Sequence, residues 1–349
     1  MIDGVQAHGS MPFNELRELN IDPASVLDFS ATVNPFPLPE NVKNLISPQE
    51  ISSYPDIDCY EATKSLADFH GIHVRHIALT AGMTEAIFAL PRLFNTAAQF
   101  GPTYGDYAEA YRRNNQYMES LLFPEASGMP DTLQWLQHRS LDVVIVCNPN
   151  NPNGRYLSPD SIQQLCEVVP QTTVCIDESY QELGEDCETA LPLLSHCGNL
   201  LILKSLTKPF GIGGLRAAYA VSSEETIQKL SNFLLPWGVS SIAQRIVPSL
   251  INNHQCFQRQ WTDIIARKQD LMQALSNDRF IVSSGRCPFF LVKTGNAEHT
   301  RQRLLKEHHI AIRSCASFGM PEWIRIMPGR EEQSRYLLEG LKNEKCNFS

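Results

Sequence analysis

The sequence predicts an α/β protein in which a mostly parallel sheet lies between helices and a smaller α+β domain follows. Three observations support this prediction. Between about residues 76 and 221, short apolar segments alternate with segments of amphipathic helical pattern. Such alternation favours a parallel sheet that is covered on both faces. The chain has 349 residues, which is comfortable for two domains, and its pattern changes after Pro236-Trp237-Gly238.

The predicted elements follow from local signals. The strands of the larger domain are expected at 76–80, 97–100, 142–147, 172–177, 200–204 and 217–221. Helices are expected over 82–94, from about 104 and over 224–235, and another begins at Pro159 with Ser158 as its cap. The later part predicts a long helix over 240–276, strands at 289–293, 310–314 and 323–327, and helices near 298–307 and over 331–342.

These elements divide the chain into three parts. We expect a large domain over 41–236, a small α+β domain over 237–349, and an N-terminal segment over 1–40 that packs with the small domain. No internal repeat or low-complexity linker interrupts this organisation.

Composition narrows the class of protein. Hydrophobic residues make up 43% of the chain, charged residues 19%, and the formal net charge is −9. An acidic chain without a basic run argues against binding to nucleic acid or to anionic membranes. The N-terminus does not resemble a signal peptide, and no apolar run approaches the roughly 20 residues that cross a bilayer. We therefore expect a cytoplasmic protein without nucleic-acid or membrane partners.

The ten cysteines do not form a metal or disulfide pattern. None occurs as C-x-x-C, and several, such as Cys147 and Cys175, lie in strand-like apolar runs. Buried, reduced thiols are the expected state, and no metal site is predicted.

The segment from Lys204 to Arg216 carries the strongest chemical signal. It reads KSLTKPFGIGGLR, so that a strand is followed by a serine, a lysine and an arginine around a glycine-rich turn. A partly desolvated lysine has a lowered pKa and can attack an aldehyde. Ser205 and Arg216 are suited to bind one phosphate. An isolated S-x-x-K pattern more often belongs to a solvated loop, so the remaining motifs decide the interpretation.

Two further motifs follow strands. Asn148–Gly154 reads NPNNPNG, and Asp177–Tyr180 reads DESY. An acidic residue at the carboxyl end of a strand lies where open α/β sheets bind their ligands. At Leu79–Ala86 a predicted strand passes through a small-residue turn into a helix, whose free N–H groups are suited to bind a phosphate.

Together these motifs resemble those of the class I/II aminotransferases, which are pyridoxal 5′-phosphate (PLP) enzymes of fold type I. The resemblance extends in order and spacing over about 54–330, and includes GPTYGDY at 101–107, YPD at 54–56 and the strand around Arg325. It implies a seven-stranded sheet and a Schiff base between PLP and Lys208. It also implies a set of cofactor-binding residues: Tyr54, Met83, Thr84, Tyr107, Asn151, Asp177, Tyr180, Ser205, Lys208 and Arg216.

Several roles are carried over by this resemblance. Asp177 keeps the pyridine nitrogen protonated, which makes PLP an electron sink. A tyrosine of the 101–107 segment stacks on the ring, and Tyr107 is favoured over Tyr104. Tyr54 reaches the partner's cofactor, which implies a homodimer. Arg325 clamps the α-carboxylate of the amino-acid substrate.

Two branches of the family are closest in appearance, threonine-phosphate decarboxylase and histidinol-phosphate aminotransferase. The similar segments are HGS at 8–10, LDFSATVNP at 27–35 and IAIRSC at 310–315. The resemblance assigns Arg313 to a substrate phosphate and places His8, Thr32 and Asn34 on the substrate side. His8 is equally compatible with a surface position.

The substrate remains open at this stage. Ser10, Thr32, Asn153 and Ser314 depart from the decarboxylase pattern, which has glycine, asparagine, threonine and aspartate there. These departures suggest a specialised substrate, for example a γ-hydroxylated amino acid such as hydroxyarginine that undergoes elimination or cyclisation. A plain aminotransferase is a further alternative. A PLP-binding transcriptional sensor is disfavoured, because Tyr54 already belongs to the fold and leaves no room for a DNA-binding module before it.

Overall fold

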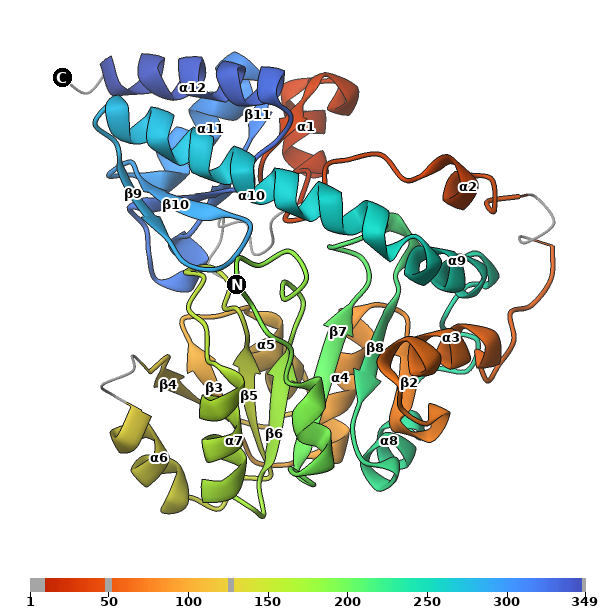
Figure 1. Ribbon diagram of the computed structural model, residues 1–349. Helices are drawn as coiled ribbons and strands as arrows, with labels where there is room; N and C mark the ends of the chain where they lie inside the picture. The colour runs from red at the N-terminus through yellow and green to blue at the C-terminus, as the bar shows by residue number, and fades with distance from the viewer. Residues whose placement is uncertain (1–9, 48–51, 125–128, 347–349) are drawn as a thin grey trace.

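A computed structural model describes residues 10–47, 52–124 and 129–346. Its large part is built on a seven-stranded sheet with the order β2-β8-β7-β6-β5-β3-β4 (Figure 1). The strands are β2 Ile77–Thr80, β3 Ala97–Gly101, β4 Met118–Leu122, β5 Val143–Cys147, β6 Thr173–Asp177, β7 Leu200–Ser205 and β8 Ala218–Val221. All neighbours run parallel except β8, which is antiparallel to β2 and β7. The predicted α/β fold class is therefore confirmed.

Helices cover both faces of this sheet. On β5, Val144 and Val146 belong to one hydrophobic cluster, whereas Val143 and Ile145 belong to another. This alternation is the two-residue period of a strand that is buried on both faces. The helices of this part are α3 Tyr60–His70, α4 Met83–Leu93, α5 Asp106–Arg113, α6 Met129–Gln137, α7 Pro159–Val168 and α8 Glu224–Ser231. Helices α3, α6 and α7 contribute to the first cluster, and α4, α5 and α8 to the second.

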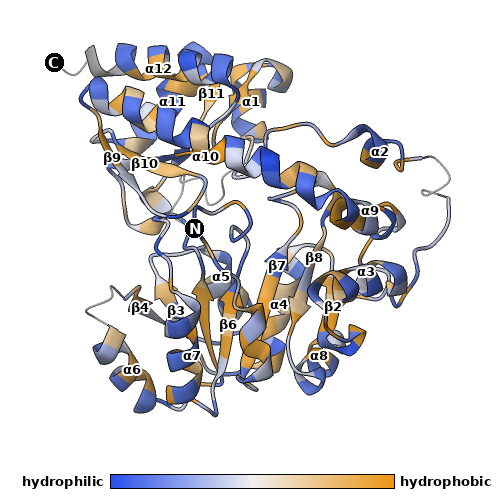
Figure 2. Ribbon diagram, viewed as in Figure 1, coloured by the Kyte–Doolittle hydropathy of each residue, from blue (hydrophilic) through white to orange (hydrophobic). Residues whose placement is uncertain are grey.

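The hydropathy of the elements matches this layered arrangement. The strands of the large sheet are predominantly hydrophobic, whereas the helices around them are mixed (Figure 2). Edge strand β4 was not predicted, because only Met118 of its sequence MESLL is buried and Glu119 and Ser120 interrupt any apolar run. Ser158 caps α7 as predicted, since its side chain accepts a hydrogen bond from the N–H group of Ser161.

A smaller unit contains a four-stranded antiparallel sheet with the order β12-β13-β10-β9. Its strands are β9 Ile281–Ser284, β10 Phe290–Lys293, β12 Arg313–Ser314 and β13 Trp323–Ile326, and its helices are α11 Ala297–His308 and α12 Glu331–Cys346. The predicted helix over 240–276 is divided at Asn253 into α9 Ser241–Asn252 and α10 His254–Asn277. Strand β9 was missed because most of its side chains are exposed.

The N-terminal residues lie against this smaller unit. They form α1 Phe13–Leu19 and β1 Leu27–Asp28, whereas the next helix, α2 Glu40–Lys43, packs against α9 and places Val42 in the first hydrophobic cluster of the large part. Strand β1 pairs in parallel with β11, Ile310–Ala311, and Leu16 and Val26 share a hydrophobic cluster with Leu305. The predicted strand over 310–314 is thus divided between two sheets, with β11 in one and β12 in the other.

Two properties of the described residues bear on function. None of their helices combines the length and the apolar character that a membrane span requires. The cysteines whose side chains are described are all free, and eight of the nine are at least partly buried.

Candidate active site

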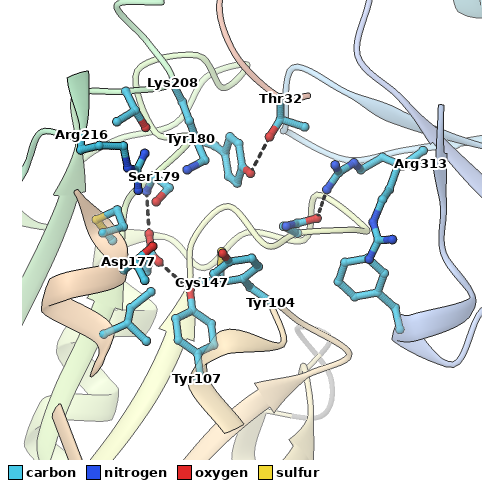
Figure 3. A pocket seen from close by; sticks show the side chains of 17 residues that line it. Thr32, Tyr104, Tyr107, Cys147, Asp177, Ser179, Tyr180, Lys208, Arg216 and Arg313 are labelled. Carbon is cyan, nitrogen blue, oxygen red and sulfur yellow. Dashed lines mark hydrogen bonds between the residues drawn. The ribbon is translucent and has the colours of Figure 1, made fainter. Parts of the chain in front are cut away.

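A cavity of about 170 Å³ lies where the carboxyl ends of β5, β6 and β7 meet the start of α4 and the smaller unit (Figure 3). Ligands of open α/β sheets bind at this edge. Most of the predicted site residues line the cavity: Thr32, Met83, Thr84, Tyr107, Asn151, Asp177, Tyr180, Lys208, Arg216, Arg313 and Arg325. The structure thus brings together residues that are up to 293 positions apart in the chain.

Lys208 is the buried amine of this cavity. Burial lowers the pKa of Lys208 below its ordinary value, and the charges of Arg216 and Arg325 lower it further, against the opposing effect of Asp177. Its Nζ lies 5.5 Å from the centre of the Tyr180 ring. Within the described parts of the chain, no hydrogen bond or ion pair engages this amine. A buried amine with a lowered pKa is a better nucleophile near neutral pH than an ordinary lysine.

Asp177 is the carboxylate of the cavity, at the end of β6. Its Oδ1 accepts a hydrogen bond from the N–H group of Ser179 at 2.8 Å, and its Oδ2 accepts one from the Tyr107 hydroxyl at 2.5 Å (Figure 3). These two bonds fix the direction of the carboxylate. Asp177 is therefore preorganised to receive a hydrogen bond from a ring nitrogen without reorganising.

The contact with Asp177 changes the interpretation of the two tyrosines. Tyr107 is fully buried and points its hydroxyl end-on at the carboxylate. Tyr104 also lines the cavity, and its ring stands at 83° to that of Tyr107 with 5.7 Å between centroids. The sequence favoured Tyr107 for stacking on a bound ring. In the structure the hydroxyl of Tyr107 is instead hydrogen-bonded to Asp177, and Tyr104 is the better placed of the two rings for stacking on a bound ring.

The start of α4 and Arg216 form a candidate phosphate-binding site, which we call the cradle. Met83 and Thr84 stand in the first turn of α4, where backbone N–H groups have no intrahelical partner. Gly82 precedes them with a φ of +82°, and a Cβ atom there would lie 2.7 Å from Nη2 of Arg216. Glycine is required here for two reasons, because the backbone is left-handed and the guanidinium group occupies the space of a side chain.

The opposite end of the cavity carries two more arginines. Arg325 donates hydrogen bonds to Oδ1 of Asn151 at 2.5 Å and to the carbonyl of Ser30 at 2.9 Å. Arg313 donates to Oγ of Ser317 at 2.6 Å. Burial, followed by the charge of Arg325, lowers the pKa of Arg313 to about 10. The two guanidinium groups therefore repel one another across this end of the cavity.

A pair of hydroxyl groups completes the wall. Thr32 Oγ1 and the Tyr180 hydroxyl lie 2.8 Å apart, within hydrogen-bonding distance (Figure 3). Thr32 comes from the loop after β1, whereas Tyr180 follows β6. This contact connects the N-terminal part of the chain to the large sheet at the cavity.

Three of the predicted residues that the structure describes do not line the cavity. Ser205 is buried below the cavity and pairs its Oγ with Oγ1 of Thr207, which does line the cavity. The amide of Asn34 donates to the carbonyl of Pro209 and to Gln260, so Asn34 holds the loop after Lys208, and it is not among the residues that line the cavity. Tyr54 is 87% exposed and lies outside the cavity. His8 lies outside the described residues.

Several lining residues were missed by sequence reasoning, namely Ile87, Cys147, Ser179, Thr207 and Phe318. Ser179 and Thr207 lie inside the two strongest motifs, so their positions beside Asp177 and Lys208 were available as a signal. Ile87, Cys147 and Phe318 carry no such local signal.

The fold and this site define a class of protein, that of the PLP-dependent enzymes of fold type I. The cavity offers a nucleophilic amine, an oriented carboxylate and a glycine-lined cradle with an arginine, and these groups match the aldehyde, ring nitrogen and phosphate of PLP.

Comparisons with known proteins identify the family. The chain matches the family model "Aminotransferase class I and II" over residues 24–341 and belongs to that family. Similar proteins include histidinol-phosphate aminotransferase 1 of Bacillus cereus, with 26% identity over 91% of this chain and 89% of that one. Threonine-phosphate decarboxylase of Salmonella typhimurium is 27% identical over 97% of this chain and 96% of that one. PLP is accordingly the cofactor, and the chain is an enzyme of the aminotransferase and decarboxylase type.

Solved structures show the same fold. Histidinol-phosphate aminotransferase from Clostridium acetobutylicum superposes with a TM-score of 0.83 at 22% identity, covering 91% of this chain and 99% of that chain. The enzyme of the same name from Sinorhizobium meliloti, solved in complex with PLP, gives a TM-score of 0.85 at 18% identity over 97% and 95% of the two chains.

The cradle leads to a test of cofactor binding. We expect Gly82→Ala to weaken PLP binding by about 10- to 100-fold, because the added methyl group displaces Arg216, and a displaced group loses much of its interaction. The dissociation constant is measured from the absorbance change when PLP is added to apoprotein. Gly105→Ala is the matched control, since a Cβ atom at Gly105 meets nothing within 4 Å. Equal affinities for the two variants would contradict the assigned cradle.

Proposed function

We propose that this enzyme acts on an L-amino acid that carries a second anionic group, with a phosphate ester as the favoured class. The observation that carries this proposal is the pair of buried arginines, Arg313 and Arg325, at one end of the cavity. In the resemblance, Arg325 binds the α-carboxylate and Arg313 a distal phosphate. The names of the similar proteins from Bacillus cereus and Salmonella typhimurium also contain phosphorylated compounds.

Charge supports the same substrate class. The described lining of the cavity contains Lys208, Arg216, Arg313 and Arg325, but only one carboxylate, Asp177. A bound cofactor would supply a phosphate to Arg216 and a ring nitrogen to Asp177. The two remaining arginines lie close enough for the charge of Arg325 to lower the pKa of Arg313, and a substrate that brings anionic groups to both would be attracted to this end of the cavity. A substrate with a carboxylate and a phosphate satisfies this requirement.

The cofactor end would be held by residues of the large sheet. Lys208 would hold the cofactor aldehyde through its amine, Arg216 and the start of α4 its phosphate, and Asp177 the protonated ring nitrogen. Tyr104 would cover one face of the ring. When bound, PLP accepts the electrons of the bond that is broken at the substrate Cα.

Lys208 would also serve as the base at the substrate. With the substrate bound, the Nζ of Lys208 would lie in the cavity and could take or return a proton at Cα. Arg325 and Arg313 would fix the two ends of the substrate and thereby decide which bond at Cα faces the ring. Removal of the proton leads to transamination or elimination, and loss of the carboxylate leads to decarboxylation. Both outcomes are therefore available to the same residues.

The charge of the cavity weighs against one alternative. A γ-hydroxylated arginine would bring a guanidinium group towards Arg313, and no carboxylate among the described lining residues is free to receive it. Elimination from an uncharged or anionic γ-substituted amino acid remains compatible with the site, as does plain transamination.

A substrate panel tests the function directly. Holoenzyme is incubated with O-phosphothreonine, O-phosphoserine, histidinol phosphate, glutamate, alanine and γ-hydroxyarginine, and the products are analysed for CO₂, ammonia, keto acid and loss of water. We expect turnover to be fastest with O-phosphothreonine or O-phosphoserine, and slower with histidinol phosphate, because histidinol phosphate has no α-carboxylate for Arg325. Lys208→Ala should abolish turnover, because it removes both the attachment point and the base. A preference for hydroxyarginine would contradict the proposal.

The role of Arg313 can be separated from general binding. We expect Arg313→Gln to raise KM for the phosphorylated substrate by about 100-fold, which corresponds to the loss of a buried charge-assisted contact. KM for alanine should change little, because alanine has no distal anion. Arg330→Gln is the control, since Arg330 is exposed. Equal effects of Arg313→Gln on both substrates would sink the assignment.

We further propose a homodimer in which Tyr54 serves the partner's site. Tyr54 does not line the cavity of its own chain, and its ring lies 5.7 Å from that of Trp237. Neighbouring apolar side chains at Ile57, Tyr60 and Leu235 are also more than half exposed. An exposed aromatic and aliphatic patch of this kind is typical of an interface.

Sedimentation velocity tests the dimer. We expect the native chain to sediment as a dimer, and Trp237→Glu to shift it towards the monomer because the variant places a charge in the apolar patch. A native chain that sediments only as a monomer at micromolar concentration would contradict the proposal.

A further inference from the structure

The loop between β9 and β10 joins the smaller unit to the large sheet beside the active site. This loop consists of residues 285–289 and faces the large sheet (Figure 1). We call residues 285–289 the connecting segment. None of them lines the active-site cavity, and none was singled out by the sequence motifs.

Backbone contacts fasten the connecting segment to two loops of the large part. The N–H group of Arg286 donates to the carbonyl of Gly154 at 2.8 Å, and the N–H group of Glu185 donates to the carbonyl of Arg286 at 2.8 Å. At Gly285 the approach is so close that a Cβ atom would lie 2.3 Å from the carbonyl oxygen of Gly154. The two segments of the chain therefore meet backbone to backbone, which only glycine permits.

A buried lysine holds the connecting segment from the other side. Lys268 lies on α10 and is 1% exposed. Its Nζ donates hydrogen bonds to the carbonyl oxygens of Gly285 at 2.7 Å and Cys287 at 2.8 Å, and Oε2 of Glu185 lies 3.6 Å away. A buried ammonium group is costly unless its donors are satisfied, so these two carbonyls must stay in place as long as the lysine is charged.

The far end of the connecting segment reaches the substrate arginine. The guanidinium carbon of Arg325 lies 4.9 Å from the centre of the Phe289 ring, and the edge of Phe289 meets Tyr180 with 5.1 Å between centroids. The thiol of Cys287 lies 3.4 Å from the carbonyl of Asn150, the neighbour of the asparagine that accepts from Arg325. The connecting segment thus supplies the Phe289 ring that packs on Arg325, and it also contacts the loop that carries Asn151, the hydrogen-bond partner of Arg325.

We propose that Lys268 is a positioning residue that holds Arg325 in its substrate-binding direction through residues 285–289. This inference rests on the proposed function, because it assumes that Arg325 binds the α-carboxylate. Lys268 touches neither the cavity nor its lining, and it acts only through the segment that it fastens. Loss of the lysine should therefore weaken substrate binding and leave cofactor binding intact.

The test uses the Lys268→Met holoenzyme, which retains the length of the side chain but lacks its donors. We expect KM for the best amino acid of the panel to rise about 10- to 100-fold, because a small misplacement of a positioning group costs this much. The dissociation constant of PLP should stay within about twofold of the native value. Hydrogen exchange read by mass spectrometry should be faster over 285–293 and 323–327, and unchanged over 200–208.

Two variants show that the donors matter and not the mutation as such. Lys268→Arg retains donors for both carbonyls and should restore most of the native KM and exchange pattern. Lys229→Met removes an exposed lysine on α8 that is paired only with Glu225, and should behave like the native enzyme. If Lys268→Met does not fold, Cys287→Ala removes a single contact of the same segment and should give a smaller change in the same direction.

The outcomes distinguish this inference from the proposed function. Native KM and native exchange in a folded Lys268→Met or Cys287→Ala variant would overturn the positioning role. An Arg325→Lys variant with native KM would instead overturn the carboxylate assignment, and the exchange data would still decide whether Lys268 fastens residues 285–289.

Discussion

The active site depends on an imbalance of charge in a buried space. Lys208, Arg216, Arg313 and Arg325 line one cavity, and Asp177 is the only carboxylate among the lining residues that the structure describes. Buried cations raise the free energy of the folded protein unless they are paired. Anionic groups that bind in this cavity would interact favourably with these cations, and we propose the cofactor phosphate at one end and the substrate at the other. Burial is the main cause of the lowered pKa of Lys208, and the charges of Arg216 and Arg325 lower this pKa further, so that the amine is prepared to react.

The sheet explains why these groups can be held so close together. Strands β6 and β7 are parallel neighbours, so Asp177 and the loop that begins after Ser205 emerge side by side at the same edge. Lys204, which lies on β7 outside the cavity, places its buried ammonium group 2.8 Å from a carboxylate oxygen of Glu178 and 3.0 Å from one of Glu182. Removing one partner of such a network would cost about 3–5 kcal/mol, because it leaves a buried charge unpaired. These ion pairs thus connect the carboxyl ends of β6 and β7, which carry Asp177 and the loop to Lys208.

Much of the cofactor end was predictable because its signals are local. The motifs around Lys208 and Asp177 each follow an apolar strand, and both positions lie in the cavity as predicted. Side-chain direction was not predictable. Asn34 lies close to the site but gives its amide to the loop after Lys208, and Tyr107 gives its hydroxyl to Asp177. These outcomes depend on partners distant in sequence, which a local motif does not contain. Elements with exposed faces, such as β4 and β9, escaped prediction for the related reason that they leave no apolar pattern.

The two ends of the cavity differ in how they are built, and this difference bears on specificity. The cofactor end comes from one sheet and its connecting turns. The end that we propose for the substrate is assembled from Thr32 near the N-terminus, from Arg313 and Arg325 of the smaller unit, and from Asn151 in the loop after β5. The hydrogen bond between Arg325 and Asn151 crosses between the two parts. Two residues of the proposed substrate end, Arg313 and Arg325, belong to the smaller unit. Substitutions in that unit can therefore alter what is bound without moving Lys208 or Asp177. A chain of this fold can therefore keep its cofactor chemistry while its substrate changes, and the departures at Thr32 and Ser314 lie at or beside that variable end.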